Sequence, residues 1–340
     1  MIRNAARKTT VLAVGVALGI GCVTPAVADP APDDGVLEHA GARTAADRQR
    51  VQDYWTAEKM KMVTRAGDAP DPVGKDADDL PGQDRTRPSS GAVWGGGGLV
   101  RKTVGRLFMT SYFKDESGKL QADDRSCTGT VVEGTAGSTV VTAAHCVLSG
   151  DRGDQAVWDT NVYFVPGYRD GAKPLGGFTV NTTFIPADYK EKLSPGSDVA
   201  MLAMNPAADG RKISEITGTQ KIRFGAQRGQ GQFTYDFGYS AEGYGKEEPW
   251  RTGQLLGYCA GPAAKDDTHP EWNHWGVRCD MYRGSSGGPH FVDFDAKSGS
   301  GTVVGVNSNM NRKDGKTFEF AAPLGEAARK LYLRAQEPAR

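Results

Sequence analysis

Three short motifs, far apart in the chain, constrain the fold more than any other feature of the sequence. Residues 142–146 read Thr-Ala-Ala-His-Cys, residues 197–200 read Ser-Asp-Val-Ala, and residues 284–289 read Gly-Ser-Ser-Gly-Gly-Pro. A fold that uses all three must bring distant segments of the chain to one place.

The pattern of apolar and turn-forming residues beyond residue 98 predicts an all-β fold. Apolar and β-branched runs recur at short intervals between glycine and aspartate turns, and no βαβ alternation is visible in the sequence. These runs cover residues 103–109, 127–132, 139–142, 162–165, 199–204, 232–237, 254–258 and 302–307. The run 321–336 predicts one helix with an apolar stripe. About 240 residues follow residue 100, enough for two small barrels and their cores.

The first 28 residues have the pattern of an export signal. Basic residues precede an apolar run over 11–23, and residues 26–28 read Ala-Val-Ala. The run is short for a membrane span, and the small residues suit a signal peptidase site. We therefore expect a secreted, extracellular protein. A retained anchor, and lipid attachment at Cys22, are the alternatives.

Residues 29–98 have a composition unsuited to a compact core, since Asp, Ala, Pro, Gly and Arg dominate. Residues 44–63 stand apart, because helix-forming residues there carry apolar side chains at helical spacing. This segment predicts a short docking helix in a propeptide, or in a flexible leader without a role. Four glycines at 95–98 predict a joint before a folded domain over 99–340.

Signal removal leaves four cysteines: Cys127, Cys146, Cys259 and Cys279. An even number in an exported chain indicates disulfides, and four cysteines allow three connectivities. We expect the local pairing, 127 with 146 and 259 with 279, because each pair falls within one half of the proposed fold.

The charge balance gives no reason to expect binding to nucleic acid or to an anionic membrane. The chain has 41 basic and 41 acidic side chains. His269 and His274 lie among acidic residues, but their spacing matches no standard zinc pattern. We expect no metal, no cofactor and a monomer.

The three motifs together indicate acyl transfer through an activated serine. They place His145, Asp198 and Ser286 in that order. A serine hydroxyl needs a base, and the base needs an acceptor that fixes its tautomer. The glycines around Ser286 would aim the backbone N–H groups of Gly284 and Ser286 at a developing oxyanion. Taken singly, the three residues could be a core histidine, a turn aspartate and a flexible loop.

These motifs resemble those of the chymotrypsin-fold (trypsin-like) serine peptidases, in particular a secreted bacterial branch related to the glutamyl endopeptidases. The resemblance covers about residues 100–336. It implies two six-stranded antiparallel β-barrels, roughly 99–210 and 211–340, with the active site between them. It also implies a bridge from Cys127 to Cys146 and a serine endopeptidase that acts on proteins or peptides through an acyl-enzyme.

One residue departs from the family pattern. Members activated by proteolysis usually carry an aspartate just before the nucleophile, and it pairs with a newly freed amino terminus. This chain has Ser285 there. A neutral hydroxyl cannot form that ion pair, so we expect this activation switch to be absent.

The resemblance also implies a substrate pocket. Asp280 lies six residues before Ser286, where trypsin-like members hold the carboxylate that binds Arg or Lys. Asn307 stands where glutamyl endopeptidases have a histidine, and Ser308 aligns with the family's backbone-supporting serine, so both are expected in this pocket. The expected preference is therefore Arg or Lys before the scissile bond, although Asp280 could equally be a structural loop residue.

Two other functions fit parts of the pattern. Residues 284–288 satisfy the Gly-x-Ser-x-Gly motif of esterases and lipases, but that fold requires the order Ser, Asp, His. Only His290 follows the serine, four residues on. A protease-like binding module without activity also stays open, because the geometry of the three residues decides between them.

Overall fold

The computed structural model describes residues 35–63, 86–150, 155–241 and 249–338. The predicted signal peptide, residues 1–28, lies outside these residues. In the described part of the chain, no helix has both the length and the apolar character needed to cross a membrane.

The first sheet is a closed antiparallel barrel with one extra strand. Its order is β1-β9-β10-β5-β4-β3-β8, and β8 also pairs with β9, which closes six of the strands into a ring. Closure leaves only short free edges. The bounds are β1 Val36–Ala40, β3 Val104–Lys114, β4 Leu120–Val131, β5 Thr139–Thr142, β8 Thr160–Pro166, β9 Phe178–Pro186 and β10 Ala200–Met204.

The second sheet has the order β14-β15-β18-β17-β16-β12-β13-β2, and β11 pairs in parallel with β17. A disulfide joins Cys259 in β13 to Cys279, directly after β15. This bond draws the two ends of the central six strands together. The bounds are β2 Ser89–Val93, β11 Lys221–Ile222, β12 Phe233–Gly238, β13 Gly257–Pro262, β14 Ala264–Lys265, β15 Trp275–Arg278, β16 Pro289–Asp295, β17 Ser300–Lys313 and β18 Lys316–Pro323.

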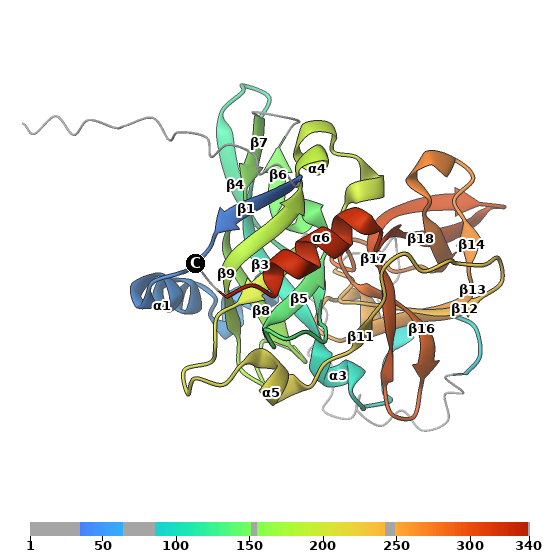
Figure 1. Ribbon diagram of the computed structural model, residues 1–340, viewed down its shortest axis with the longest axis horizontal. Helices are drawn as coiled ribbons and strands as arrows, with labels where there is room; N and C mark the ends of the chain where they lie inside the picture. The colour runs from blue at the N-terminus through green and yellow to red at the C-terminus, as the bar shows by residue number, and fades with distance from the viewer. Residues whose placement is uncertain (1–34, 64–85, 151–154, 242–248, 339–340) are drawn as a thin grey trace, which may run out of the picture. The chain divides into compact units, whose positions relative to one another are not determined.

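The all-β prediction is confirmed, with the chymotrypsin-type arrangement of a barrel, a second curved sheet and a C-terminal helix. The other elements are short: β6 Leu148–Gly150 pairs with β7 Ala156–Trp158, and the helices α3 Val100–Thr103, α4 Ala187–Lys192 and α5 Ile213–Thr217 lie in connections. Figure 1 shows the barrel strands in colours from teal through green to yellow, and the second sheet mostly in orange and red.

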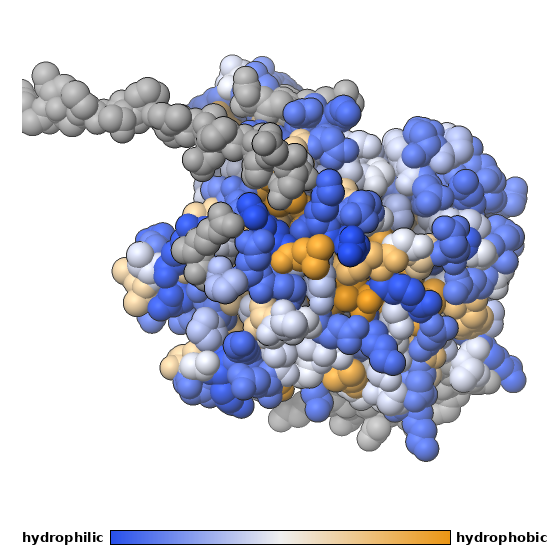
Figure 2. All heavy atoms as spheres, in the orientation of Figure 1, coloured by the Kyte–Doolittle hydropathy of each residue, from blue (hydrophilic) through white to orange (hydrophobic). Residues whose placement is uncertain are grey.

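The C-terminal helix is shorter than the sequence predicted. Helix α6 spans Glu326–Ala335, because residues up to Pro323 belong to β18. Ala328 and Leu331 are buried, whereas Leu333 is 50% exposed. The helix crosses β9 (Figure 1). The face shown in Figure 2 is mostly hydrophilic, with apolar residues gathered near its centre.

The segment 36–63 packs into the same core as the barrel. β1 pairs with β9 over its whole length, from Val36 opposite Pro186 to Ala40 opposite Thr182. Two short helices follow, α1 Ala45–Tyr54 and α2 Ala57–Met62, where the sequence predicted one. The break occurs because the Thr56 side chain accepts from the backbone N–H of Lys59 and begins a second helix. A domain boundary at residue 98 stays a prediction.

Candidate active site

Strand pairing brings the histidine and the aspartate together. Ala200 in β10 lies opposite Thr142 in β5, and the chain turns just beyond these residues on both strands. The Nδ1 atom of His145 lies 2.7 Å from Oδ2 of Asp198. The backbone N–H of His145 donates to the other carboxylate oxygen at 2.9 Å. Both aspartate oxygens therefore hold the histidine in one orientation.

The electrostatics of this pair favour an ionised aspartate. Burial acts to raise the pKa of Asp198, but the charge of His145 and its hydrogen bonds outweigh burial and lower it. For His145, burial acts to lower the pKa, whereas the charge of Asp198 prevails and raises it. Ser308 donates its hydroxyl to Oδ2 of Asp198 at 2.7 Å and so helps to hold this carboxylate. Its expected place in the substrate pocket stays a prediction.

The turn that carries Ser286 depends on two glycines. Gly284 has φ +92° and Gly287 has φ +77°. A Cβ on Gly284 would lie 2.4 Å from the carbonyl oxygen of Tyr239, and one on Gly287 would lie 2.1 Å from Oγ1 of Thr142. Side chains at these positions would clash with Tyr239, just after β12 of the second sheet, and with Thr142 of the barrel, so the sequence can form this turn only with glycine.

Hydrogen bonds tie this turn to the first barrel. Thr128 in β4 donates its backbone N–H to the carbonyl of Ser286 at 2.8 Å and its hydroxyl to the carbonyl of Gly284 at 2.8 Å. Within the described residues, the backbone N–H groups of Gly284 and Ser286 have no protein acceptor. Two donors are thus left beside the Ser286 hydroxyl.

Ser286 and His145 line one groove of about 800 Å³. Among the described hydrogen bonds, none joins the Ser286 hydroxyl to the His145 ring. Nucleophile and base commonly come into full contact only when substrate binds. The groove is therefore bordered by a serine hydroxyl, by a histidine ring held by a carboxylate and by two backbone N–H groups without a described protein acceptor.

Ser285 contacts a carboxyl group that the sequence motifs did not reveal. Its hydroxyl oxygen lies 2.6 Å from the carbonyl oxygen of Tyr282 and also reaches Oε1 of Glu319 in β18. A hydroxyl has one proton to donate, so both contacts are satisfied only when Glu319 carries a proton. Burial raises the pKa of Glu319, which supports that protonation state.

A second buried carboxyl completes this cluster. Asp236 in β12 contacts Glu319, and burial together with the Glu319 charge raises its pKa. Two carboxyls in one buried space hold a proton between them, because both cannot be charged there. Asn307 donates to Oδ1 of Asp236 at 2.6 Å and to the carbonyl of Ser285 at 3.3 Å.

The structure corrects the expected position of Asn307. The sequence placed it in the substrate pocket, but its side chain is fully buried among Asp236 and the Ser285 backbone. The Asn307 amide therefore supports the turn that carries Ser286, and it has no exposed surface with which to line a pocket. Asp280 is half-buried, and its backbone N–H donates to the carbonyl of Ser90 at 2.7 Å. Its expected role in specificity stays a prediction.

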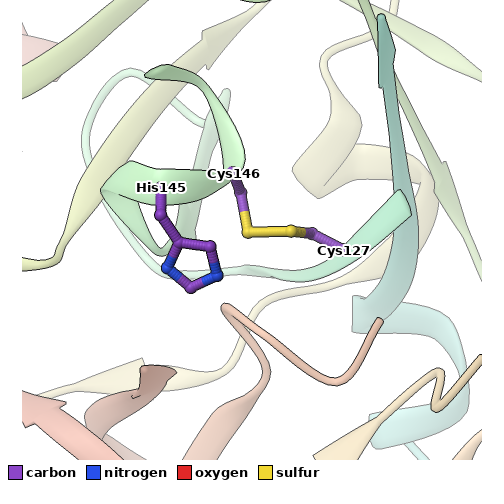
Figure 3. Close-up of side chains that lie close together, drawn as sticks. All are labelled: Cys127, His145 and Cys146. Carbon is purple, nitrogen blue, oxygen red and sulfur yellow. A yellow bond between two sulfur atoms is a disulfide. The ribbon is translucent and has the colours of Figure 1, made fainter. Parts of the chain in front are cut away.

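Within the described ranges, two groups of side chains have the spacing of metal ligands. One consists of Cys127, His145 and Cys146 (Figure 3), and the other of Asp236, Cys259 and Cys279. In both groups the two cysteines are bonded to each other, with the local pairing expected from the sequence. Since the thiolate is the metal-binding form of cysteine, neither group suits a metal ion.

The two loop histidines flagged in the sequence are placed differently. His274 is fully buried, with Nδ1 2.6 Å from Oδ1 of Asn309 and Nε2 2.9 Å from the carbonyl oxygen of Pro195. It therefore ties β17 to the turn that precedes Asp198. His269 is half-buried and stacks on Trp272.

The comparisons with known proteins agree with this geometry. A family model described as a trypsin-like peptidase domain matches residues 127–306. Protease Anisep from Arthrobacter nicotinovorans is 30% identical to this chain, with a TM-score of 0.58. The aligned part covers 69% of this chain and 95% of the Anisep chain. A thermostable serine protease, AL20, from an extremophilic microorganism is 25% identical with a TM-score of 0.56, covering 70% and 98%. No curated protein matches the chain.

The matched residues run from Cys127 in β4 to Val306 in β17, so they include all three sequence motifs. Family match, fold and structural relatives concur on one class of hydrolase. The chain belongs to the trypsin-like serine peptidases.

Proposed function

We propose that the protein is a secreted serine endopeptidase in which Ser286 is the nucleophile, His145 the general base and Asp198 the residue that orients it. The observation that carries this proposal is the double contact of Asp198 with His145, on the Nδ1 atom and on the backbone N–H. This contact keeps the proton on Nδ1 and leaves Nε2 free to accept the serine proton.

Catalysis then follows from the groups around the groove. Ser286 attacks the carbonyl carbon of the scissile bond while its proton passes to His145. The N–H groups of Gly284 and Ser286 stabilise the oxyanion of the tetrahedral intermediate. His145 gives the proton to the departing amine, which leaves an acyl-enzyme, and water repeats the sequence to release the acid product.

Secretion is supported by the signal-like sequence of residues 1–28 and by two disulfides. Preference for Arg or Lys before the scissile bond is supported only by the position of Asp280. A peptide-library profile of the parent and of Asp280→Asn checks it. Equal or faster cleavage after Glu or large apolar residues would contradict this preference.

Labelling with a fluorophosphonate probe tests the mechanism. We expect the secreted parent to be labelled and Ser286→Ala to remain unlabelled, with a loss of about 10⁶ in kcat. Matching thermal unfolding of the two proteins controls for folding. A folded parent that neither reacts with the probe nor cleaves peptides would instead be a binding module.

A further inference from the structure

The groove at Ser286 has a wall that comes from the segment before the peptidase motifs. Lys59, Met62 and Val63, at the end of α2, line it together with His145 and Ser286. The groove retains about 800 Å³ with this wall in place. The described part of α2 therefore borders the catalytic groove without filling it.

The groove lies on the leaving-group side of the nucleophile. It is lined by Gly284 of the nucleophile turn and by Cys127, whose disulfide partner follows His145. Its described lining includes neither Asp280 nor β17, where the pocket for the residue before the scissile bond is expected. Because His145 protonates the departing amine, the residues after the scissile bond leave along its side of the site.

α2 is anchored to the barrel by buried contacts. Trp55 is fully buried, its ring centre lies 5.2 Å from that of Phe108, and its Nε1–H donates to the carbonyl of Asn161 at 2.6 Å. Arg106, also fully buried, donates to the carbonyl of Met60 at 3.3 Å. Loss of the segment would remove this acceptor and expose the apolar surface that Trp55 covers, which is unfavourable.

Charged side chains that line the groove form ion pairs with one another. The end of α2 beside them presents an apolar side chain, that of Met62. Lys59 lies 3.0 Å from Asp124, and Arg125 lies 3.6 Å from Asp123. Met62 is 55% exposed, although it is a large apolar side chain. An apolar substrate side chain placed against it would gain burial without separating an ion pair.

We propose that α2 forms part of a substrate subsite, in which Met62 and Val63 receive a large apolar side chain after the scissile bond, and that residues 36–63 remain with the active enzyme. The inference rests on the proposed peptidase function. Release of residues 29–98 as a propeptide, predicted from the sequence, is the opposite outcome.

Internally quenched peptides with one acyl sequence test the subsite. One series carries Leu or Phe in the first two positions after the scissile bond and the other carries Ser there. We expect Met62→Ala to lower kcat/KM about tenfold for the apolar series and to leave the Ser series unchanged. Leu333→Ala replaces a similarly exposed apolar residue on α6; it is the matched control and should change neither series.

A nitroanilide with the same acyl sequence separates this proposal from the proposed function, because it has no residue after the scissile bond. Hydrolysis of the nitroanilide with no effect of Met62→Ala on the apolar series overturns the subsite. Absence of nitroanilide hydrolysis by the parent instead overturns the peptidase function. Mass spectrometry of the probe-labelled enzyme tests whether residues 36–63 remain with it, and we expect to find them. Their absence from the active enzyme would contradict this part of the proposal.

Discussion

Replacing Trp55 with alanine should destabilise the active enzyme severely, although Trp55 lies 90 residues before His145. Its indole ring has no exposed surface, packs against Phe108, and donates to the carbonyl of Asn161 at 2.6 Å. The substitution removes these contacts together and leaves a cavity between α1–α2 and the barrel.

The magnitude follows from these contacts. Replacing a fully buried tryptophan with alanine typically costs about 3–5 kcal/mol, through lost burial and the remaining cavity. The lost N–H···O bond adds about 1 kcal/mol, because the half-buried Asn161 can partly recover by bonding to water. At about 2 °C per kcal/mol for a domain of this size, the midpoint of thermal unfolding should fall by about 10 °C.

Differential scanning fluorimetry of the purified enzyme, blocked with fluorophosphonate to prevent self-digestion, measures this change. Met62→Ala, at an exposed position on the same segment, is the control and should stay within about 1 °C of the parent. If Trp55→Ala and the parent have the same midpoint of thermal unfolding, residues 36–63 do not stabilise the active enzyme and the reasoning fails.

Two further predictions concern the charges at the site. Asp198→Asn should lower kcat about 10⁴-fold. Since the Asp198 charge raises the pKa of His145 and the base must be neutral, the acid limb of kcat/KM should also shift to lower pH; an unshifted limb in the residual activity would contradict this. Glu319→Gln should flatten the fall of stability with rising pH, because the raised pKa of Glu319 makes the folded state hold a proton that the unfolded state loses. This contribution to the free energy of unfolding is present below about pH 4.5 and is lost as pH rises through the raised pKa. Urea unfolding at about pH 5 and pH 8 checks it. An equal change in unfolding free energy between these two pH values, in the parent and in Glu319→Gln, would contradict it.

The sequence was sufficient to predict the proximity of His145 and Asp198 because each motif is local. Each lies at the end of a predicted strand, and those strands, β5 and β10, pair with each other. β9 was not predicted, because it lies between β1 and β10 and has no alternation of buried and exposed residues. Its polar residues conceal the strand: Asn181 bonds to Asn205, and Thr182 accepts from Arg43.

The packing of residues 36–63 could not be predicted from composition. Over residues 29–98, charged and turn-forming residues outweigh the few apolar ones. Three of those, Val36, Trp55 and Met60, are almost entirely buried in the main core. The ladder between β1 and β9 adds backbone hydrogen bonds, which do not depend on side-chain identity. A few large residues and one strand pairing are therefore enough to hold a segment that looks unstructured on average.

Glu319 was the least predictable part of the site, because it lies 34 residues after Ser285 and belongs to no motif. The sequence predicted only that Ser285 cannot bind a newly freed amino terminus. Glu319 in β18 contacts the Ser285 hydroxyl, and Asn307 in β17 donates to the Ser285 carbonyl. The turn that carries Ser286 is therefore held by side chains of the second sheet. Its two N–H donors are already without protein acceptors while residues 36–63 are in place. We therefore expect any control by this segment to act at the groove, which the end of α2 lines, and not through the backbone N–H groups of Gly284 and Ser286.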